Sequence, residues 1–133
     1  MPSVSTETIA TRGVVAAILA ALGNAVLVAV ADALAISPNS PHLAYPRVVV
    51  FTVAGVLLAT GVYWVLARRQ ASPDATFIRI AVVALVLSVL PDVGLWMNDP
   101  TVTAAGAVVL AAMHVVAAVV VVGVLLRDPG AWP

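Results

Sequence analysis

The chain has 133 residues, of which 63% are hydrophobic and only 9% charged, and its mean hydropathy is +1.15. Soluble domains carry about 25% charged residues, so lipid must surround most of this chain. The formal net charge is zero, with six arginines and no lysine. We therefore expect no nucleic-acid partner, because no basic surface exists to hold a phosphate backbone. The lack of cysteine excludes disulfides and thiolate metal sites.

The first half of the chain predicts two membrane helices. Residues 13–36 form a long apolar run that only Asn24 and Asp32 interrupt. At 1.5 Å per residue this run crosses a hydrocarbon core of about 30 Å. It is longer than the roughly 7 to 15 apolar residues of a signal peptide, which favours a membrane helix although Arg12 precedes it. A loop rich in proline, SPNSPHLAYP, separates it from a second helix predicted over residues 47–67.

The second half predicts two more helices, and the third contains a proline. The third is expected over residues 77–96 and includes Pro91. Proline has no amide proton for the carbonyl of Leu87, so the helix should bend or end there unless the Ser88 hydroxyl or a water pairs that carbonyl. The fourth is expected over residues 102–126.

The ends of the helices predict the topology. Thr101 or Thr103 is expected to cap the fourth helix at its start, and the segment RDPG from Arg127 is expected to stop it. Five arginines fall in connections on one side of the membrane, and Arg47 alone falls on the other. The five are Arg12, Arg68, Arg69, Arg79 and Arg127. The positive-inside rule then places both termini in the cytoplasm.

These elements predict an all-α fold: a four-transmembrane-helix bundle of up-down-up-down topology that forms a single membrane domain over residues 1–133. The use of arginine without lysine, together with abundant alanine and valine, suggests a GC-rich bacterial genome. We therefore expect a multi-pass protein of the bacterial inner membrane.

Four ionisable residues lie in or against apolar sequence and form the predicted site: Asp32, Asp92, His114 and Arg47. A carboxylate kept from water must be paired, protonated or bound to metal. Asp32 and Asp92 lie near the outer ends of their helices, where Arg47 also lies, and His114 falls near the bilayer midplane. Two interpretations of His114 stay open: an interhelical hydrogen bond that helps assembly, or a ligand-binding or proton-relay group.

The sequence assigns no catalytic residue, cofactor or metal site. It contains no H-E-x-x-H, no Glu-x-x-His, no phosphate-binding glycine loop and no G-x-S-x-G. Asn24, deep in the first predicted helix, is interpreted as an assembly contact.

Two short segments carry a resemblance. LSVLPDV at residues 87–93, followed by a polar turn and VVLAAMHVVAAVVVV at residues 108–122, is similar to the second half of an uncharacterised family of small four-helix bacterial membrane proteins. Asp32, near the end of the first helix, also fits the pattern of that family. The resemblance implies four spans and points to Asp92 and His114. It implies no reaction.

Three functions are compatible with this pattern. The first is a non-enzymatic ligand-binding or accessory subunit with an outward-facing polar pocket, in contact with membrane lipid and assembled as a homo-oligomer or in a larger complex. The second is a proton-linked small transporter or channel subunit in which Asp32, Asp92 and His114 titrate. The third is an intramembrane enzyme acting on a lipid-soluble substrate, with Asp92 or His114 as general base. The absence of catalytic motifs favours the first.

Overall fold

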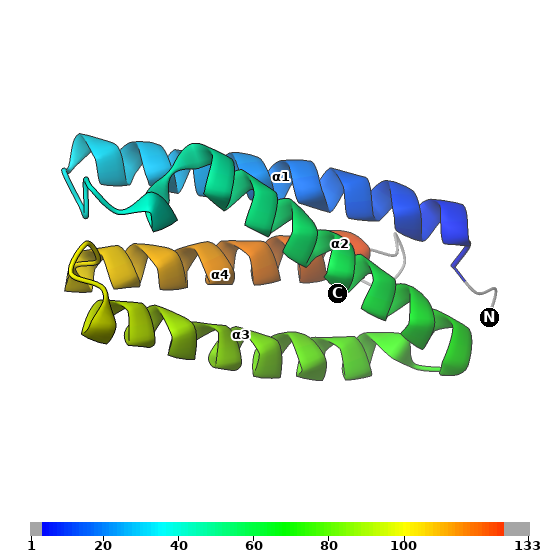
Figure 1. The fold of residues 1–133 in the computed structure, drawn as a ribbon. Coiled ribbons are helices and arrows are strands. Elements are labelled where there is room, and N and C mark those ends of the chain that lie inside the picture. The colour runs from blue at the N-terminus through cyan, green and yellow to red at the C-terminus, as the bar shows by residue number, and fades with distance from the viewer. Residues whose placement is uncertain (1–3, 127–133) are drawn as a thin grey trace.

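The computed structural model describes residues 4–126 and contains four long α-helices and one short 3-10 helix in that range. The elements are α1 (Thr6–Ala33), η1 (Pro41–Leu43), α2 (Tyr45–Arg69), α3 (Pro73–Asn98) and α4 (Ala104–Leu125). Successive helices run in opposite directions (Figure 1). Each of the four is long and apolar enough to cross a membrane, which confirms the predicted all-α, four-helix membrane fold. We call the end of the bundle with η1 and the α3–α4 turn the η1 end, and the opposite end, with the α2–α3 turn, the distal end.

Polar caps make two helices begin where they do. The Ser5 hydroxyl accepts a hydrogen bond from the amide of Thr8, at 3.1 Å, so α1 begins seven residues before the predicted apolar run. The Thr103 hydroxyl accepts from the amide of Gly106, also at 3.1 Å, as one of the two predicted caps of α4. The capping residues therefore predict the starts of these helices better than the length of the apolar run does.

The helix α3 passes through Pro91 and ends only at Asn98. The Ser88 hydroxyl donates to the carbonyl of Leu85, at 2.7 Å, and not to that of Leu87 as the sequence suggested. Of the two outcomes expected at the proline, a bend or an end, the structure therefore excludes the end.

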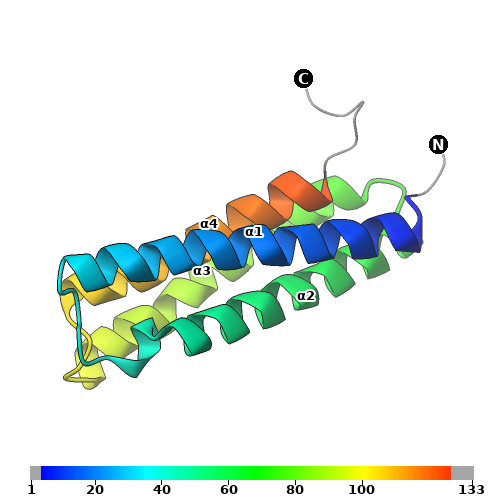
Figure 2. The same cartoon turned by 90° about the horizontal axis from the view of Figure 1, so that it is seen from above.

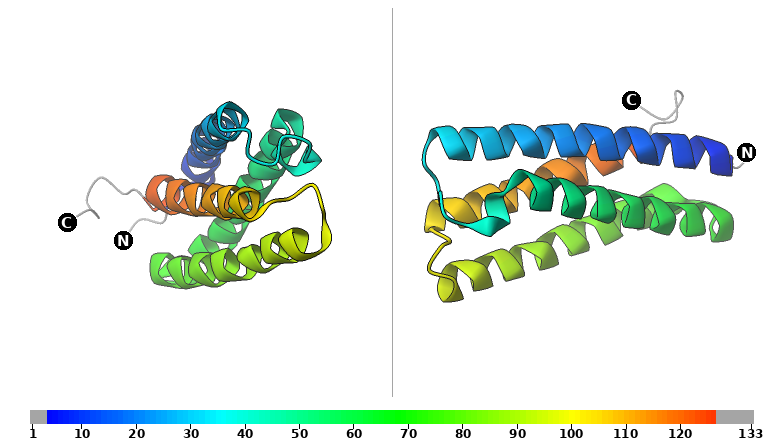
Figure 3. Two further views of the ribbon diagram at one scale, coloured as in Figure 1. Left: turned by 90° about the vertical axis from the view of Figure 1, so that its left-hand side faces the viewer. Right: turned by 45° about the horizontal axis from the view of Figure 1, so that its top comes forward.

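The helix α4 lies between α1 and α3 (Figure 3), while α2 packs mainly against α1. The views in Figures 1 and 2 agree that α1 and α4 run side by side. Buried side chains form one cluster from α1, α2, α3 and α4 toward the distal end and a second from α1, η1, α2 and α4 toward the η1 end. Only Phe77 and Asp92 of α3 are buried, so α3 is the least embedded helix.

Small and polar residues bring α1 and α2 together. A Cβ atom added to Gly13 would lie 2.4 Å from Cγ2 of Thr60, so the two backbones approach as closely as glycine allows. The side-chain amide of Asn24 donates a hydrogen bond from Nδ2 to Oγ1 of Thr52, at 2.9 Å. Asn24 thus makes the interhelical bond that an assembly contact requires.

Arginines at the distal end tie the helix ends together. Arg12 donates from Nη1 to the carbonyl of Leu125, at 3.2 Å, and so pairs a carbonyl at the end of α4. The guanidinium of Arg68 lies 5.1 Å from the ring centre of Trp64 and donates to the hydroxyl of Thr6. The predicted stop at Arg127 to Gly130 lies outside the described residues. The cytoplasmic placement of the termini stays a prediction.

Candidate functional site

A cavity of about 710 Å³ lies between α2, α3 and α4. Its volume falls within the range of about 300–1,000 Å³ that is typical of small-molecule sites. Its α2 wall extends from Arg47 to Val62, which corresponds to about 22 Å of helix. Phe51 and Leu58 of α2 and Ile80 of α3 line the cavity and are exposed, so its open side lies between α2 and α3.

The two ends of this cavity differ in polarity. At the distal end the lining residues are apolar, with Val62, Phe77 and Val121 from three different helices. Small residues along the walls leave the space open. They are Gly55, Ala59, Ala81, Ala84, Ala117 and Ala118. Polar groups gather toward the η1 end. They are Asn24, His42, Arg47, Thr52, Ser88, Asp92 and His114. The cavity therefore offers a long apolar chamber with hydrogen-bonding groups in one part only.

Asp92 and His114 form the central polar pair. Oδ2 of Asp92 lies 3.0 Å from Nδ1 of His114, and Asp92 is only 4% exposed. The same Nδ1 lies 2.9 Å from the carbonyl oxygen of Leu110, one turn earlier in α4. A carbonyl can only accept, so Nδ1 carries a proton and donates it to Leu110. Oδ2 of Asp92 has no hydrogen-bond partner among the described residues, so it faces Nδ1 at the distance of an ion pair without a hydrogen bond.

The pairing follows from local structure on both helices. α3 continues past Pro91, which keeps Asp92 on a helical surface, and Asp92 is one of the two buried residues of α3. The buried stripe of α4 includes Leu110 and Met113, and His114 lies at its edge with 40% of its side chain exposed. The edge of this stripe faces the cavity, so the imidazole lines the chamber while it contacts Asp92.

The structure brings together three of the four predicted site residues and places the fourth elsewhere. Arg47 lines the η1 end of the cavity, with its guanidinium 5.6 Å from the ring centre of Phe51. Asp32 is exposed and does not line the cavity. Its neighbour Ala31 is buried, and the turn of about 100° per residue carries Asp32 off that face of α1.

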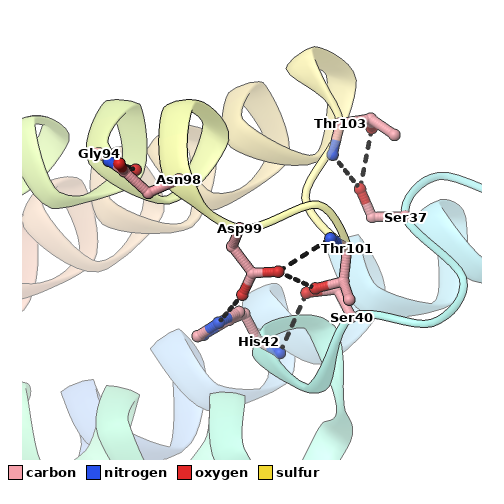
Figure 4. Close-up of polar contacts among 8 residues, drawn as sticks. All are labelled: Ser37, Ser40, His42, Gly94, Asn98, Asp99, Thr101 and Thr103. Carbon is pink, nitrogen blue, oxygen red and sulfur yellow. Dashed lines mark hydrogen bonds and ion pairs between the residues drawn. The ribbon is translucent and has the colours of Figure 1, made fainter.

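A second polar cluster, not predicted from the sequence, joins the two connections at the η1 end (Figure 4). Nε2 of His42 lies 3.1 Å from Oδ2 of Asp99, and Oδ1 of Asp99 accepts from the amide and the hydroxyl of Thr101, at 2.8 and 2.6 Å. Ser37 Oγ accepts from the amide of Thr103, at 2.9 Å, and also bonds its hydroxyl. His42 and Asp99 are 57 residues apart, so no local spacing reveals their pairing.

Hydrogen bonds set the charge state of Asp99. The hydroxyl of Thr101, then its amide, and then His42 lower the pKa of Asp99 below its usual range. Asp99 is therefore a carboxylate at neutral pH. It holds the α3–α4 turn against η1, and His42 of this pair also lines the cavity at its η1 end.

The arrangement can hold one polar group next to an apolar body. Among residues 4–126, no three histidine, aspartate or glutamate side chains gather in a way that could hold a metal ion. The chemistry available at the chamber wall is that of an imidazole oriented by a carboxylate and a backbone carbonyl.

Comparison with known proteins gives one match. No curated protein and no solved structure matches the chain. The model of one family, described as a family of unknown function (DUF6069), matches residues 4–130 and so covers nearly the whole chain. This match confirms the expected membership of an uncharacterised family. The chain is a member of DUF6069, a family of unknown function.

Proposed function

We propose that this protein binds a lipid-soluble molecule, without converting it, in the cavity between α2, α3 and α4. The observation that carries the proposal is the cavity itself: about 710 Å³, lined mostly by apolar side chains, with the Asp92–His114 pair in its wall. Ligand sites combine such apolar walls with a few polar groups that fix orientation. Because the cavity opens between two membrane-spanning helices, molecules dissolved in the bilayer have the most direct access to it.

The distribution of polar groups favours binding over proton-linked transport. A transport path needs groups that exchange protons or ions along the whole depth of the membrane. In the described part of the cavity, such groups lie toward the η1 end, and Val62, Phe77 and Val121 close the distal end. The outward-facing pocket expected from the sequence corresponds to this η1 end if the termini are cytoplasmic.

Two glycines of α2 allow a matched test. A Cβ atom added to Gly55 or to Gly61 would meet no atom within 4 Å, so neither position is crowded. Gly55 lines the cavity and Gly61 does not. A phenylalanine at position 55 should fill the chamber, whereas one at position 61 adds the same residue to the same helix outside it.

The experiment compares Gly55→Phe and Gly61→Phe with the unchanged protein, each purified in lipid nanodiscs. Native mass spectrometry and solvent extraction measure bound lipid-soluble molecules, and also the oligomeric state. We expect the unchanged protein and Gly61→Phe to retain a bound molecule that Gly55→Phe loses. Equal retention by both variants, or no bound molecule in any sample after exposure to a bacterial lipid extract, would contradict the proposal. So would a dimer that Gly55→Phe alone converts to monomer, because the cavity would then be a contact between copies.

A further inference from the structure

The orientation of the His114 ring points to the chemical class of the ligand, and this inference rests on the binding function proposed above. We infer that the cavity takes an elongated apolar molecule with a hydroxyl group, an alcohol or a phenol, whose O–H donates to Nε2 of His114. The inference follows from the hydrogen bonds of the other ring nitrogen.

The first step is the tautomer. Nδ1 lies 2.9 Å from the carbonyl oxygen of Leu110, which has no proton to give, so the proton of this bond belongs to Nδ1. The carboxylate oxygen of Asp92, 3.0 Å from Nδ1, favours the proton on the same nitrogen. In a ring with one proton, Nε2 then carries a lone pair and can only accept a hydrogen bond.

The second step is the accessible edge of the ring. Nδ1 is turned toward the backbone of α4 and toward buried Asp92, so the opposite edge of the ring, which carries Nε2, faces away from both, and 40% of the side chain is exposed. In the described residues Nε2 has no hydrogen-bond partner. The wall therefore presents an unused acceptor.

The third step is the shape of the space beside this acceptor. On α3 the lining continues from Ser88, next to the polar pair, to Phe77 at the distal end, a distance of about 16 Å along the helix. Alanines and aliphatic residues line this stretch, including Ala81 and Ala84. A ligand with its hydroxyl at His114 would thus place an extended apolar tail toward Phe77. A ligand that offers only a carbonyl or an ether oxygen would place one hydrogen-bond acceptor beside another, Nε2 of His114, with no proton to form a bond.

The test uses two probes of nearly equal shape, farnesol and farnesyl methyl ether, which differ in having and lacking the O–H. The protein contains only two histidines, so a sample in nanodiscs with 15N-labelled histidine shows four ring nitrogens, and His42→Asn assigns them. We expect Nδ1 of His114 protonated and Nε2 unprotonated, with farnesol shifting Nε2 and the ether leaving it unchanged. A single neutral hydrogen bond predicts about five- to tenfold tighter binding of the alcohol. In His114→Phe that preference should disappear while the ether still binds.

The outcomes separate the two proposals. A proton on Nε2 in the free protein, or equal affinity for the two probes, overturns the inference about the hydroxyl and leaves the binding function standing. An alcohol preference that survives in His114→Phe overturns it as well, because another group must then recognise the hydroxyl. If neither probe binds and no other apolar molecule does, both proposals fall.

Discussion

Replacing Gly13 by alanine should push α1 and α2 apart. The new Cβ atom would lie 2.4 Å from Cγ2, 2.7 Å from Oγ1 and 3.1 Å from Cβ of Thr60. Ordinary contacts begin at 3.4 Å, so the nearest pair overlaps by 1.0 Å (3.4 − 2.4). Thr60 has little freedom to move away, because its hydroxyl donates to the carbonyl of Val56 in its own helix, at 2.8 Å.

The magnitude follows from two opposing terms. Overpacking of this kind costs about 1–3 kcal/mol. Alanine gains up to about 1 kcal/mol over glycine in helix propensity, which offsets part of that cost. Gly61→Ala measures the propensity gain alone, since a Cβ atom there meets nothing within 4 Å. We therefore expect Gly13→Ala to be about 1–3 kcal/mol less stable than Gly61→Ala.

Reversible unfolding in mixed micelles measures the free energy of unfolding of both variants. A double-mutant cycle with Thr60→Ala tests whether the clash with Thr60 causes the loss of stability. Thr60→Ala removes both atoms that the new methyl group meets first, so the double variant should recover most of the stability that Gly13→Ala loses. If Gly13→Ala is as stable as Gly61→Ala, or if Thr60→Ala rescues nothing, then the close contact between α1 and α2 does not exist as described.

Two further predictions concern hydrogen bonds outside the Asp92–His114 pair. Thr52→Val removes the hydroxyl that accepts from Asn24 and should cost about 0.6–2 kcal/mol in micelle unfolding, whereas Thr60→Val, whose hydroxyl bonds its own helix, should cost less. Thr101→Val removes the strongest cause of the lowered pKa of Asp99, so its carboxyl should titrate at higher pH in a carbon NMR titration. Because a lowered pKa stabilises the folded state at pH values above the unfolded pKa, the unchanged protein should lose this contribution as pH falls below about 4. Thr101→Val should keep only the part of the contribution that the amide of residue 101 and His42 supply. A carboxyl that titrates identically in both proteins would contradict the assignment.

Hydropathy predicts the number and the nature of the helices because lipid demands long, internally hydrogen-bonded apolar segments. It predicts their ends less well. The start of α1 depends on the Ser5 hydroxyl, and its end lies before Ala35 and Ser37, whose φ values of 52° and 46° fall in the left-handed region. Alanine and serine rarely adopt this conformation, so these residues do not predict it. At Pro91 the helix continues to Asn98, so the possible end at the proline did not occur.

Part of the candidate site could be predicted for a similar reason. Asp92 and His114 attract attention because ionisable groups are rare in membrane helices, and the structure places them 3.0 Å apart. Their contact with the cavity could not be predicted, because a chamber depends on how far helices stand apart and not on any one residue. The exposure of Asp32 depends on the rotation of α1, which its weak amphipathic pattern leaves undefined from sequence. The contact of His42 with Asp99 could not be predicted either, because it depends on how the connections at the η1 end fold against each other.

The sideways mouth between α2 and α3 has a consequence for how affinity is expressed. A molecule that enters from the bilayer is in equilibrium with its mole fraction among the lipids, not with its concentration in the buffer. At a fixed amount of ligand, added lipid would therefore dilute the ligand in the bilayer and lower the occupancy of the cavity, even if the lipid itself does not enter it. Titrations at different lipid contents should coincide when occupancy is plotted against the ratio of ligand to lipid, and a molecule too polar to partition should remain unbound however well its head fits His114.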